Sequence, residues 1–483
     1  MFYQNAILRY AFFLLAFYSS VNAVGQKNSS PNILFIVVDD LGWSDLGCYG
    51  ADLHETPNID RLARQSFIFT NSYAAAPVCS PTRASILTGK YPARLNFTIW
   101  SEAAGHERRA NPTTRSITPQ TIENLPLNEI TLAEELQKKG YHTAHIGKWH
   151  VGDLMHFPEL QGFDLSVAAS QRGAPPTYFY PYKGFAFGED RFVGNLGQDD
   201  HGHYFSDRDG EYLTDRLTSE AVKMIEDAGN KPLFLNLWYY NVHTPIEAKE
   251  ADIKLFSAKK SPDLNHQNET YAAMVKAVDD NIGRILDKLE QLDKLNNTII
   301  FLLSDNGGFV NNYRDNQVTN NAPLRSGKGS LYEGGIRIPT IAHIPQLKAE
   351  GKIVEQPIST IDFFPTILEI LDINDSSPID GKSFFSLLKN DESSPGDRAL
   401  YWHYPHYYPT TTPVSAIRVG DWKLLEYLED GKIELYNLKE DLSETTNLVD
   451  THPLKKQELL DQLHQWKQNV NAQTISPNPD FKE

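Results

Sequence analysis

The chain has 483 residues, a formal net charge of −17 and only two cysteines. This length suggests two domains, one of them large enough to bury a core without disulfide bridges. The acidic balance argues against nucleic acid as the main partner, and an anionic substrate would need a locally positive pocket.

Residues 1–23 have the order of a secretory signal. Arg9 precedes the apolar run 10–17, and Val21, Asn22 and Ala23 offer a small-residue cleavage site. The run is too short to span a bilayer, and no later stretch has the length and apolar character of a membrane span. We therefore expect an exported protein, periplasmic or secreted, without a membrane span.

Apolar, β-rich runs alternate with helical segments through most of the chain. Strands are predicted at residues 33–38, 142–146, 232–238 and 298–303. Helices are predicted at residues 57–64, 131–139, 213–227 and 271–292. This alternation predicts an α/β fold in which helices cover both faces of a large, mainly parallel sheet.

The pattern changes near residues 372–397, where Asn, Asp, Ser, Pro and Gly predominate as in a linker. Beyond it come strand-like runs and then a helix, at residues 399–403, 415–419, 422–427, 432–436 and 453 to about 470. We predict a large N-terminal α/β domain over residues 24–385. A small C-terminal α+β domain, with an antiparallel sheet and one helix, would span residues 386–483.

The string Cys79-Ser80-Pro81-Thr82-Arg83 is the first candidate for chemistry. Ser80 can cap a helix and Pro81 suits its first turn, so Cys79 would lie at the positive end of a helix dipole, where anions bind. Arg83 shares a helical face with Cys79. A buried structural cysteine beside a surface arginine explains the string equally well, and a single Cys48–Cys79 bridge is the plain interpretation of two cysteines.

Oxygen-bearing side chains follow two of the predicted strands directly. Asp39 and Asp40 come after the strand 33–38, and Asp305 and Asn306 follow the strand 298–303. Ligands bind at the carboxyl ends of parallel strands, and adjacent carboxylates repel each other unless a cation lies between them. An all-oxygen set favours calcium or magnesium over zinc. Taken singly, each pair also fits a solvated strand end or a plain turn.

Cationic side chains recur at the same edge of the predicted sheet. Lys148 and His150 follow one strand, His243 follows another, and Arg325 and Lys328 lie in a Gly-rich loop. Any one of them alone would most often be structural or solvated. Together with the carboxylates they indicate an anion site beside a metal site.

In their residues and their order, these strings closely resemble the type I sulfatases of the alkaline phosphatase superfamily. The resemblance spans roughly residues 31–450. It rests on blocks at residues 33–42, 79–83, 87–89, 147–150, 243–245, 304–307 and 327–329. It implies an alkaline-phosphatase-like fold with residues 24–385 as the sulfatase catalytic domain.

The resemblance implies that a formylglycine-generating enzyme converts Cys79 to 3-oxoalanine (formylglycine). The hydrated aldehyde would attack sulfur, and the aldehyde would reform as sulfate leaves. The resemblance also implies a calcium ion held by Asp39, Asp40, Asp305 and Asn306, with residue 79 as a further ligand.

The resemblance assigns roles to five further residues. Arg83 would stabilise the ionised diol, while Lys148 and Lys328 would bind the sulfate oxygens. His243, helped by Lys328, would protonate the leaving oxygen, and His150 would take the proton that triggers sulfate release.

The stretch 402–408 is rich in rings with hydrogen-bonding tips, which suit sugar faces and edges. It resembles a segment that reaches the pocket in polysaccharide-acting members, although a seam between domains explains it equally well. We predict a sulfated carbohydrate substrate, cut from an exposed end of a polysaccharide-derived chain, with His403, His406 and Arg325 as substrate-binding residues. A weaker candidate patch comprises His106, Arg108 and Arg109.

Two other classes of function stay open. One is a phosphoester or phosphonate monoester hydrolase that uses the same fold and nucleophile. The other is an inactive glycan-binding relative, which would need a broken site, and the sequence contains no broken motif.

Overall fold

The computed structural model describes residues 30–104, 112–180, 182, 210–374, 378–389 and 398–482. The predicted signal segment, residues 1–23, lies outside them, as do His106, Arg108 and Arg109. Among the residues described, no helix combines the length and the apolar character that crossing a membrane requires.

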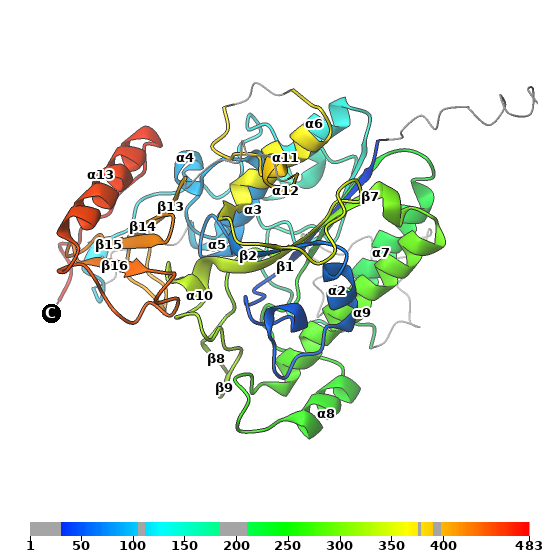
Figure 1. Ribbon diagram of the computed structural model, residues 1–483, viewed down its shortest axis with the longest axis horizontal. Helices are drawn as coiled ribbons and strands as arrows, with labels where there is room; N and C mark the ends of the chain where they lie inside the picture. The colour runs from blue at the N-terminus through cyan, green and yellow to red at the C-terminus, as the bar shows by residue number, and fades with distance from the viewer. Residues whose placement is uncertain are drawn as a thin grey trace, which may run out of the picture.

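A large mixed sheet forms the centre of the N-terminal part of the chain (Figure 1). Its strand order is β11-β2-β10-β7-β1-β6-β4-β5, and β12 also pairs with β2. The strands are β1 (Asn32–Val38), β2 (Phe67–Tyr73), β4 (His142–Gly147), β5 (Leu165–Val167), β6 (Leu233–Tyr239), β7 (Thr298–Ser304), β10 (Arg337–His343), β11 (Ile353–Val354) and β12 (Ile358–Ser359). Only β10 runs antiparallel to its described neighbours, β7 and β2, so the predicted mainly parallel sheet is confirmed.

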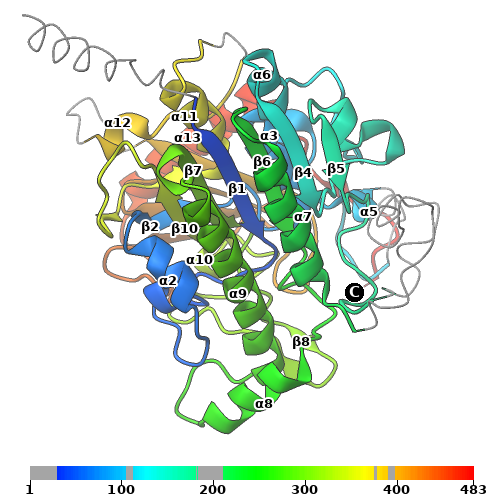
Figure 2. The same ribbon diagram turned by 90° about the vertical axis from the view of Figure 1, so that its right-hand side faces the viewer.

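Helices cover both faces of this sheet (Figure 2). The side chains of β1 alternate: Leu34 and Ile36 pack into one core, and Phe35 and Val37 into the other, as a central strand requires. The first face carries α2 (Pro57–Ala63), α7 (Leu213–Asp227) and α9 (Glu269–Gln291). The second carries α3 (Cys79–Thr88), α6 (Leu132–Lys138) and α11 (Phe363–Ile370).

A separate four-stranded antiparallel sheet follows, in the order β13-β14-β15-β16, with one helix against it. Its elements are β13 (Ala399–Tyr404), β14 (Val414–Val419), β15 (Trp422–Tyr427), β16 (Ile433–Asn437) and α13 (Pro453–Asn469). Leu459, Leu463 and Trp466 of α13 pack on one face. The other face packs through Trp402 against Tyr73 and Ile336 of the large domain. The predicted C-terminal architecture is confirmed, while the domain limits stay a prediction.

Several local predictions need correction. Helix α3 begins at Cys79, with Val78 and not Ser80 as its N-cap; the Ser80 hydroxyl accepts a hydrogen bond from Ser101 N instead (3.2 Å). Part of the predicted linker forms α12 (Phe385–Leu388). Both cysteines are free in the described structure, so the interpretation as a Cys48–Cys79 bridge is wrong.

Candidate active site

The predicted chemical residues meet at the carboxyl ends of β1, β4, β6 and β7, which are neighbours in the sheet. Asp39 and Asp40 follow β1, Lys148 follows β4, His243 lies beyond β6, and Asp305 follows β7. Figure 2 shows these strands side by side, with α7 and α9 packed across them. Parallel pairing thus brings distant residues together: Asn306 Nδ2 donates to Asp40 Oδ1 (2.8 Å), which lies 266 positions away in the sequence.

Three buried carboxylates, from Asp39, Asp40 and Asp305, lie within 4.8 Å of one another through one oxygen each. Burial and the neighbouring Asp305 raise the pKa of Asp39 well above its usual value. Within the described chain, Asp39 Oδ1 and Asn306 Oδ1 are buried without a hydrogen-bond partner. Converging carboxylates and a buried amide oxygen without a hydrogen bond fit a hard divalent cation such as calcium.

Each carboxylate also faces a buried cation. Lys148 Nζ lies 2.6 Å from Asp39 Oδ2, Lys328 Nζ lies 2.7 Å from Asp40 Oδ1, and an Arg83 guanidinium nitrogen lies 2.6 Å from Asp305 Oδ2. Burial alone would raise the pKa of Asp40, but the charge of Lys328 lowers it. Because three cations balance three carboxylates, a bound divalent cation would leave the cluster positive, as an anionic substrate needs.

Cys79 heads α3 beside this cluster and lies almost completely buried. Its Sγ lies 3.3 Å from His150 Nδ1. Burial alone would raise the pKa of the Cys79 thiol, but the charges of Lys148, His150 and Lys328 lower it to about 6. The environment of residue 79 therefore favours an anion.

Glu102 is a site residue that the sequence did not reveal. It lies on α5 (Ser101–Ala104), where its carboxylate contacts His150 Nε2 and accepts a hydrogen bond from Gly173 N (2.8 Å). Burial alone would lower the pKa of His150, but Glu102 and Cys79 raise it to about 9. The three side chains therefore lie in sequence: Cys79 at the position of the nucleophile, His150 as the base, and Glu102 as the carboxylate that orients the base.

His243 lies beside the acidic cluster, with Nε2 3.7 Å from Asp40 Oδ2. Its Nδ1 lies 2.8 Å from the Thr244 carbonyl, which can only accept, so Nδ1 carries the hydrogen. Burial and the nearby Lys328 lower the pKa of His243 to about 3. The other ring nitrogen, Nε2, therefore carries no hydrogen in the neutral ring and faces the acidic cluster.

A cavity of about 280 Å³ opens onto Cys79. It is lined by Val78, Cys79, Trp100, Glu102, His150, Gly173, Ala174, His243, Lys328 and Tyr408. Trp100 and Tyr408 meet edge to face with ring centroids 5.8 Å apart. A Cβ atom on Gly329 would lie 2.0 Å from the Tyr408 ring, so glycine lets this ring approach the Lys328 loop.

The comparisons with known proteins identify the family. Residues 31–373 match the model of the family described as Sulfatase, and residues 327–473 match the model described as N-sulphoglucosamine sulphohydrolase, C-terminal. The chain belongs to the sulfatase family. It is a sulfuric ester hydrolase, and the resemblance seen in its sequence is confirmed.

Individual relatives agree with this assignment. The sulfatase is 33% identical to a protein named "Sulfatase" from Formosa agariphila, over 94% of this chain and 90% of that one. It is 34% identical to human N-acetylgalactosamine-6-sulfatase, over 77% of this chain and 68% of that one. The crystal structure of Ps i-CgsB in complex with k-i-k-neocarrahexaose is 30% identical, with a TM-score of 0.73 over 90% of this chain and 92% of that one.

The predicted substrate-binding residues of the sulfatase lie elsewhere. The His403 ring contacts Ser415 Oγ (2.8 Å) and the Gln473 carbonyl (2.5 Å), and His406 Nε2 contacts Thr98 Oγ1 (2.8 Å). Arg325 donates to the Glu444 carbonyl (2.7 Å). None of these three predicted residues is among the described residues that line the cavity. Their role in binding substrate stays a prediction.

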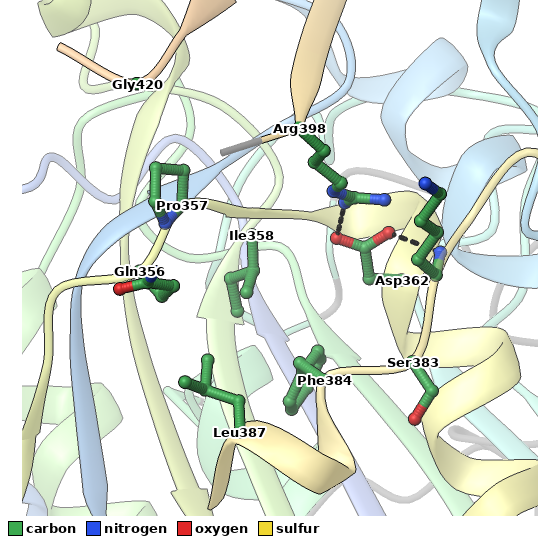
Figure 3. Close-up of a pocket in the computed structure, with 10 residues that line it drawn as sticks. Gln356, Pro357, Ile358, Asp362, Ser383, Phe384, Leu387, Arg398 and Gly420 are labelled. Carbon is green, nitrogen blue, oxygen red and sulfur yellow. Dashed lines mark hydrogen bonds and ion pairs between the residues drawn. The ribbon is translucent and has the colours of Figure 1, made fainter. Parts of the chain in front are cut away.

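Figure 3 shows a second hollow in the sulfatase, which shares no lining residue with the Cys79 cavity in the described structure. Its one carboxylate, from Asp362, pairs with Arg398 and accepts hydrogen bonds from Ser359 N (2.7 Å) and Lys382 N (2.9 Å). Because these contacts satisfy Asp362, the hollow lacks a free acid for catalysis.

Proposed function

We propose that this sulfatase removes sulfate from a carbohydrate, with residue 79 matured to formylglycine and calcium in the acidic cluster. The proposal rests on two buried oxygens, Asp39 Oδ1 and Asn306 Oδ1, that make no hydrogen bond in the described structure, and on the contact of Cys79 Sγ with His150 Nδ1 (3.3 Å). A relative named N-acetylgalactosamine-6-sulfatase and a related structure bound to a neocarrahexaose favour a sugar substrate.

Calcium would be held by Asp39, Asp40, Asp305 and Asn306 with residue 79, and it would polarise a sulfate oxygen there. The residues fit the ion because the three carboxylates converge, and because Asp39 Oδ1 and Asn306 Oδ1 make no hydrogen bond within the described structure. Lys148 and Lys328, which now neutralise Asp39 and Asp40, would then turn toward the sulfate oxygens.

A formylglycine-generating enzyme would mature residue 79, because the hydrated aldehyde offers a second hydroxyl that a thiol lacks. Arg83, 2.6 Å from Asp305, would stabilise negative charge at residue 79. His150, whose Nδ1 faces Sγ, would take the proton that allows sulfate to leave. His243, which lines the same cavity, would protonate the leaving oxygen.

The aromatic residues that line the cavity favour a ring-shaped leaving group. Trp100 and Tyr408 form flat walls on which a sugar face can pack. Because the protein is strongly acidic, a short chain that enters by its end is easier to accommodate than a long polyanion lying across the surface. We therefore propose exo-action on polysaccharide-derived oligosaccharides. The signal-like residues 1–23 support export to the periplasm or the outside.

A sulfate-release screen tests the proposal. Protein coexpressed with a formylglycine-generating enzyme would be assayed on sulfated mono- and oligosaccharides, an aryl sulfate and a phosphate monoester, after mass spectrometry of the residue 79 peptide. We expect formylglycine at residue 79 and the highest kcat/KM on a sulfated sugar. Trp100→Ala should reduce turnover of the sugar more than turnover of the aryl sulfate. Active protein with an intact thiol, or a preference for the phosphate ester, would contradict the proposal.

A further inference from the structure

The two aromatic walls of the Cys79 cavity belong to segments that meet through one buried contact. Trp100 directly precedes α5, and Tyr408 lies in the loop between β13 and β14. Two positions before each ring, Thr98 Oγ1 and His406 Nε2 lie 2.8 Å apart, within hydrogen-bond distance. Their exposed fractions are only 4% and 0%. A hydrogen bond away from water thus joins the two segments that carry the walls.

Neither partner of this hydrogen bond can act on a substrate directly. Thr98 and His406 are not among the described residues that line the cavity. The His406 ring is further fixed by the Tyr404 ring, which it meets edge to face at 5.3 Å between centroids. Side chains that contact a ligand keep a precise position only when packing and hydrogen bonds behind them fix it. Any effect of this pair on a substrate would therefore pass through Trp100 and Tyr408.

Other contacts keep the Tyr408 loop folded. The backbone groups of Tyr408 and Thr411 exchange two hydrogen bonds, of 3.0 and 2.9 Å. The Thr410 hydroxyl donates to the Lys328 carbonyl (2.7 Å). Because these contacts do not involve Thr98, removal of the Thr98 hydroxyl should loosen the position of the ring without unfolding the small domain.

We propose that Thr98 and His406 are positioning residues, whose hydrogen bond sets the placement of Trp100 and Tyr408 and thereby the recognition of the leaving sugar. This inference rests on the proposed carbohydrate substrate. It gives His406, which was expected from the sequence to bind substrate, an indirect role instead. The alternative is that the pair only joins the two domains.

Thr98→Val tests the inference, because valine has the shape of threonine without its hydroxyl. The two probes are a nitrophenyl sulfate and the sulfated sugar that the release screen ranks first. We expect kcat/KM on the sugar to fall roughly 2- to 10-fold, mainly through KM, which is the effect of one net hydrogen bond. Turnover of the nitrophenyl sulfate should stay unchanged. Thr98→Ser, which keeps the hydroxyl, should restore the wild-type values.

Thr218→Val is the matched control. The Thr218 hydroxyl is equally buried and lies 2.7 Å from the Tyr239 hydroxyl, on α7. This variant should keep both activities. If Thr98→Val does not fold, His406→Leu removes the same hydrogen bond from the other side and should give the same selective loss.

Amide hydrogen exchange provides a readout that needs no substrate. In full-length protein, Thr98→Val should speed exchange in the peptide that covers residues 405–411, because the loop would open locally more often. Thr98→Ser and Thr218→Val should exchange as the wild type does. Unchanged exchange in Thr98→Val would show that the hydroxyl does not hold this loop.

The two proposals fail in different ways. If Trp100→Ala selectively damages turnover of the sugar but Thr98→Val reduces both activities equally, the sugar substrate stands and the hydrogen bond only joins the domains. If the wild type cleaves no sulfated sugar, the carbohydrate proposal is wrong and the inferred role in recognition falls with it. Amide exchange would then decide only whether Thr98 positions the loop.

Discussion

The Glu102 carboxylate contacts the His150 ring at Nε2, and the opposite ring atom, Nδ1, lies 3.3 Å from Cys79 Sγ. An imidazole held from behind by a carboxylate keeps one tautomer and one orientation, as in nucleophile–histidine–acid triads. Glu102 therefore positions the base without touching residue 79.

Replacing this carboxylate should slow the chemical step. We expect Glu102→Gln to lower kcat roughly 10- to 100-fold with little change in KM, because general acid–base catalysis contributes about 10²- to 10⁴-fold. Steady-state kinetics on a small aryl sulfate would measure kcat and KM separately. The exposed Glu123→Gln serves as the control. An unchanged kcat, or a loss matched by partial unfolding, would remove Glu102 from this role.

Loss of one calcium ligand should be repairable by excess calcium. Asn306 Oδ1 is buried and unpaired among the described residues, so Asn306→Ala should weaken calcium binding while leaving the three carboxylates in place. We expect chelated wild type to be inactive, and the variant to need far more calcium for half-maximal activity. Full turnover by metal-free protein, checked by elemental analysis, would rule out the metal; recovery with magnesium alone would correct its identity.

The contact between the domains should depend on one buried lysine. Lys423 of β15 is fully buried and pairs with Glu333 Oε1 (2.8 Å) and Glu444 Oε1 (2.9 Å). Because Lys423→Met leaves the buried Glu444 carboxylate without its cation, and leaves Glu333 paired with Arg337 alone (3.3 Å), it should cost about 3–5 kcal/mol of the free energy of unfolding. Urea denaturation would measure this cost. Lys254→Met, which breaks the exposed pair with Glu250 (2.6 Å), should cost less than about 1 kcal/mol. Equal costs would contradict the prediction.

His403 should make stability depend on pH. Burial lowers its pKa from 6.5 to about 3, so between these values the unfolded chain binds a proton that the folded chain does not. Its contribution to stability is therefore full above about pH 6.5 and falls as the pH drops toward 3, by at most about 1.4 kcal/mol per pH unit. His403→Gln should flatten this fall in urea midpoints measured from pH 7 to pH 5.

The same variant bears on the predicted substrate role of His403. If His403 only supports the fold, His403→Gln should reduce turnover of a sulfated sugar and of an aryl sulfate equally. Selective loss on the sugar would support the prediction from sequence. His452→Gln, at an exposed position of the same domain, should keep the wild-type pH dependence and both activities.

The sequence predicted the residues at strand ends well, because the carboxyl ends of parallel strands necessarily share one edge. Once the strands were recognised, four site residues could be placed at this edge: Asp39, Lys148, His243 and Asp305. Strands β2 and β10 escaped prediction, since polar residues 70–72 and Pro339 interrupt their apolar pattern.

Contacts made by short or irregular segments could not be predicted. Glu102 lies on a four-residue helix, too short for any periodicity, and its partner His150 is 48 positions away. In the ring-rich stretch 402–408, the sequence could not tell which side chains face the cavity. The fold turns Tyr408 toward Lys328, while His403 packs against Gln473 within the small domain.

The burial of α3 has a consequence for biosynthesis. Every residue of Cys79–Thr88 is buried, so a maturing enzyme that must grip this string has no access to it in the finished fold. The proposed oxidation of Cys79 would therefore have to occur on the nascent or newly exported chain, in competition with folding. A host that folds the protein faster than it modifies it would accumulate a well-ordered but inert population, whose thiol no later treatment with the maturing enzyme could reach.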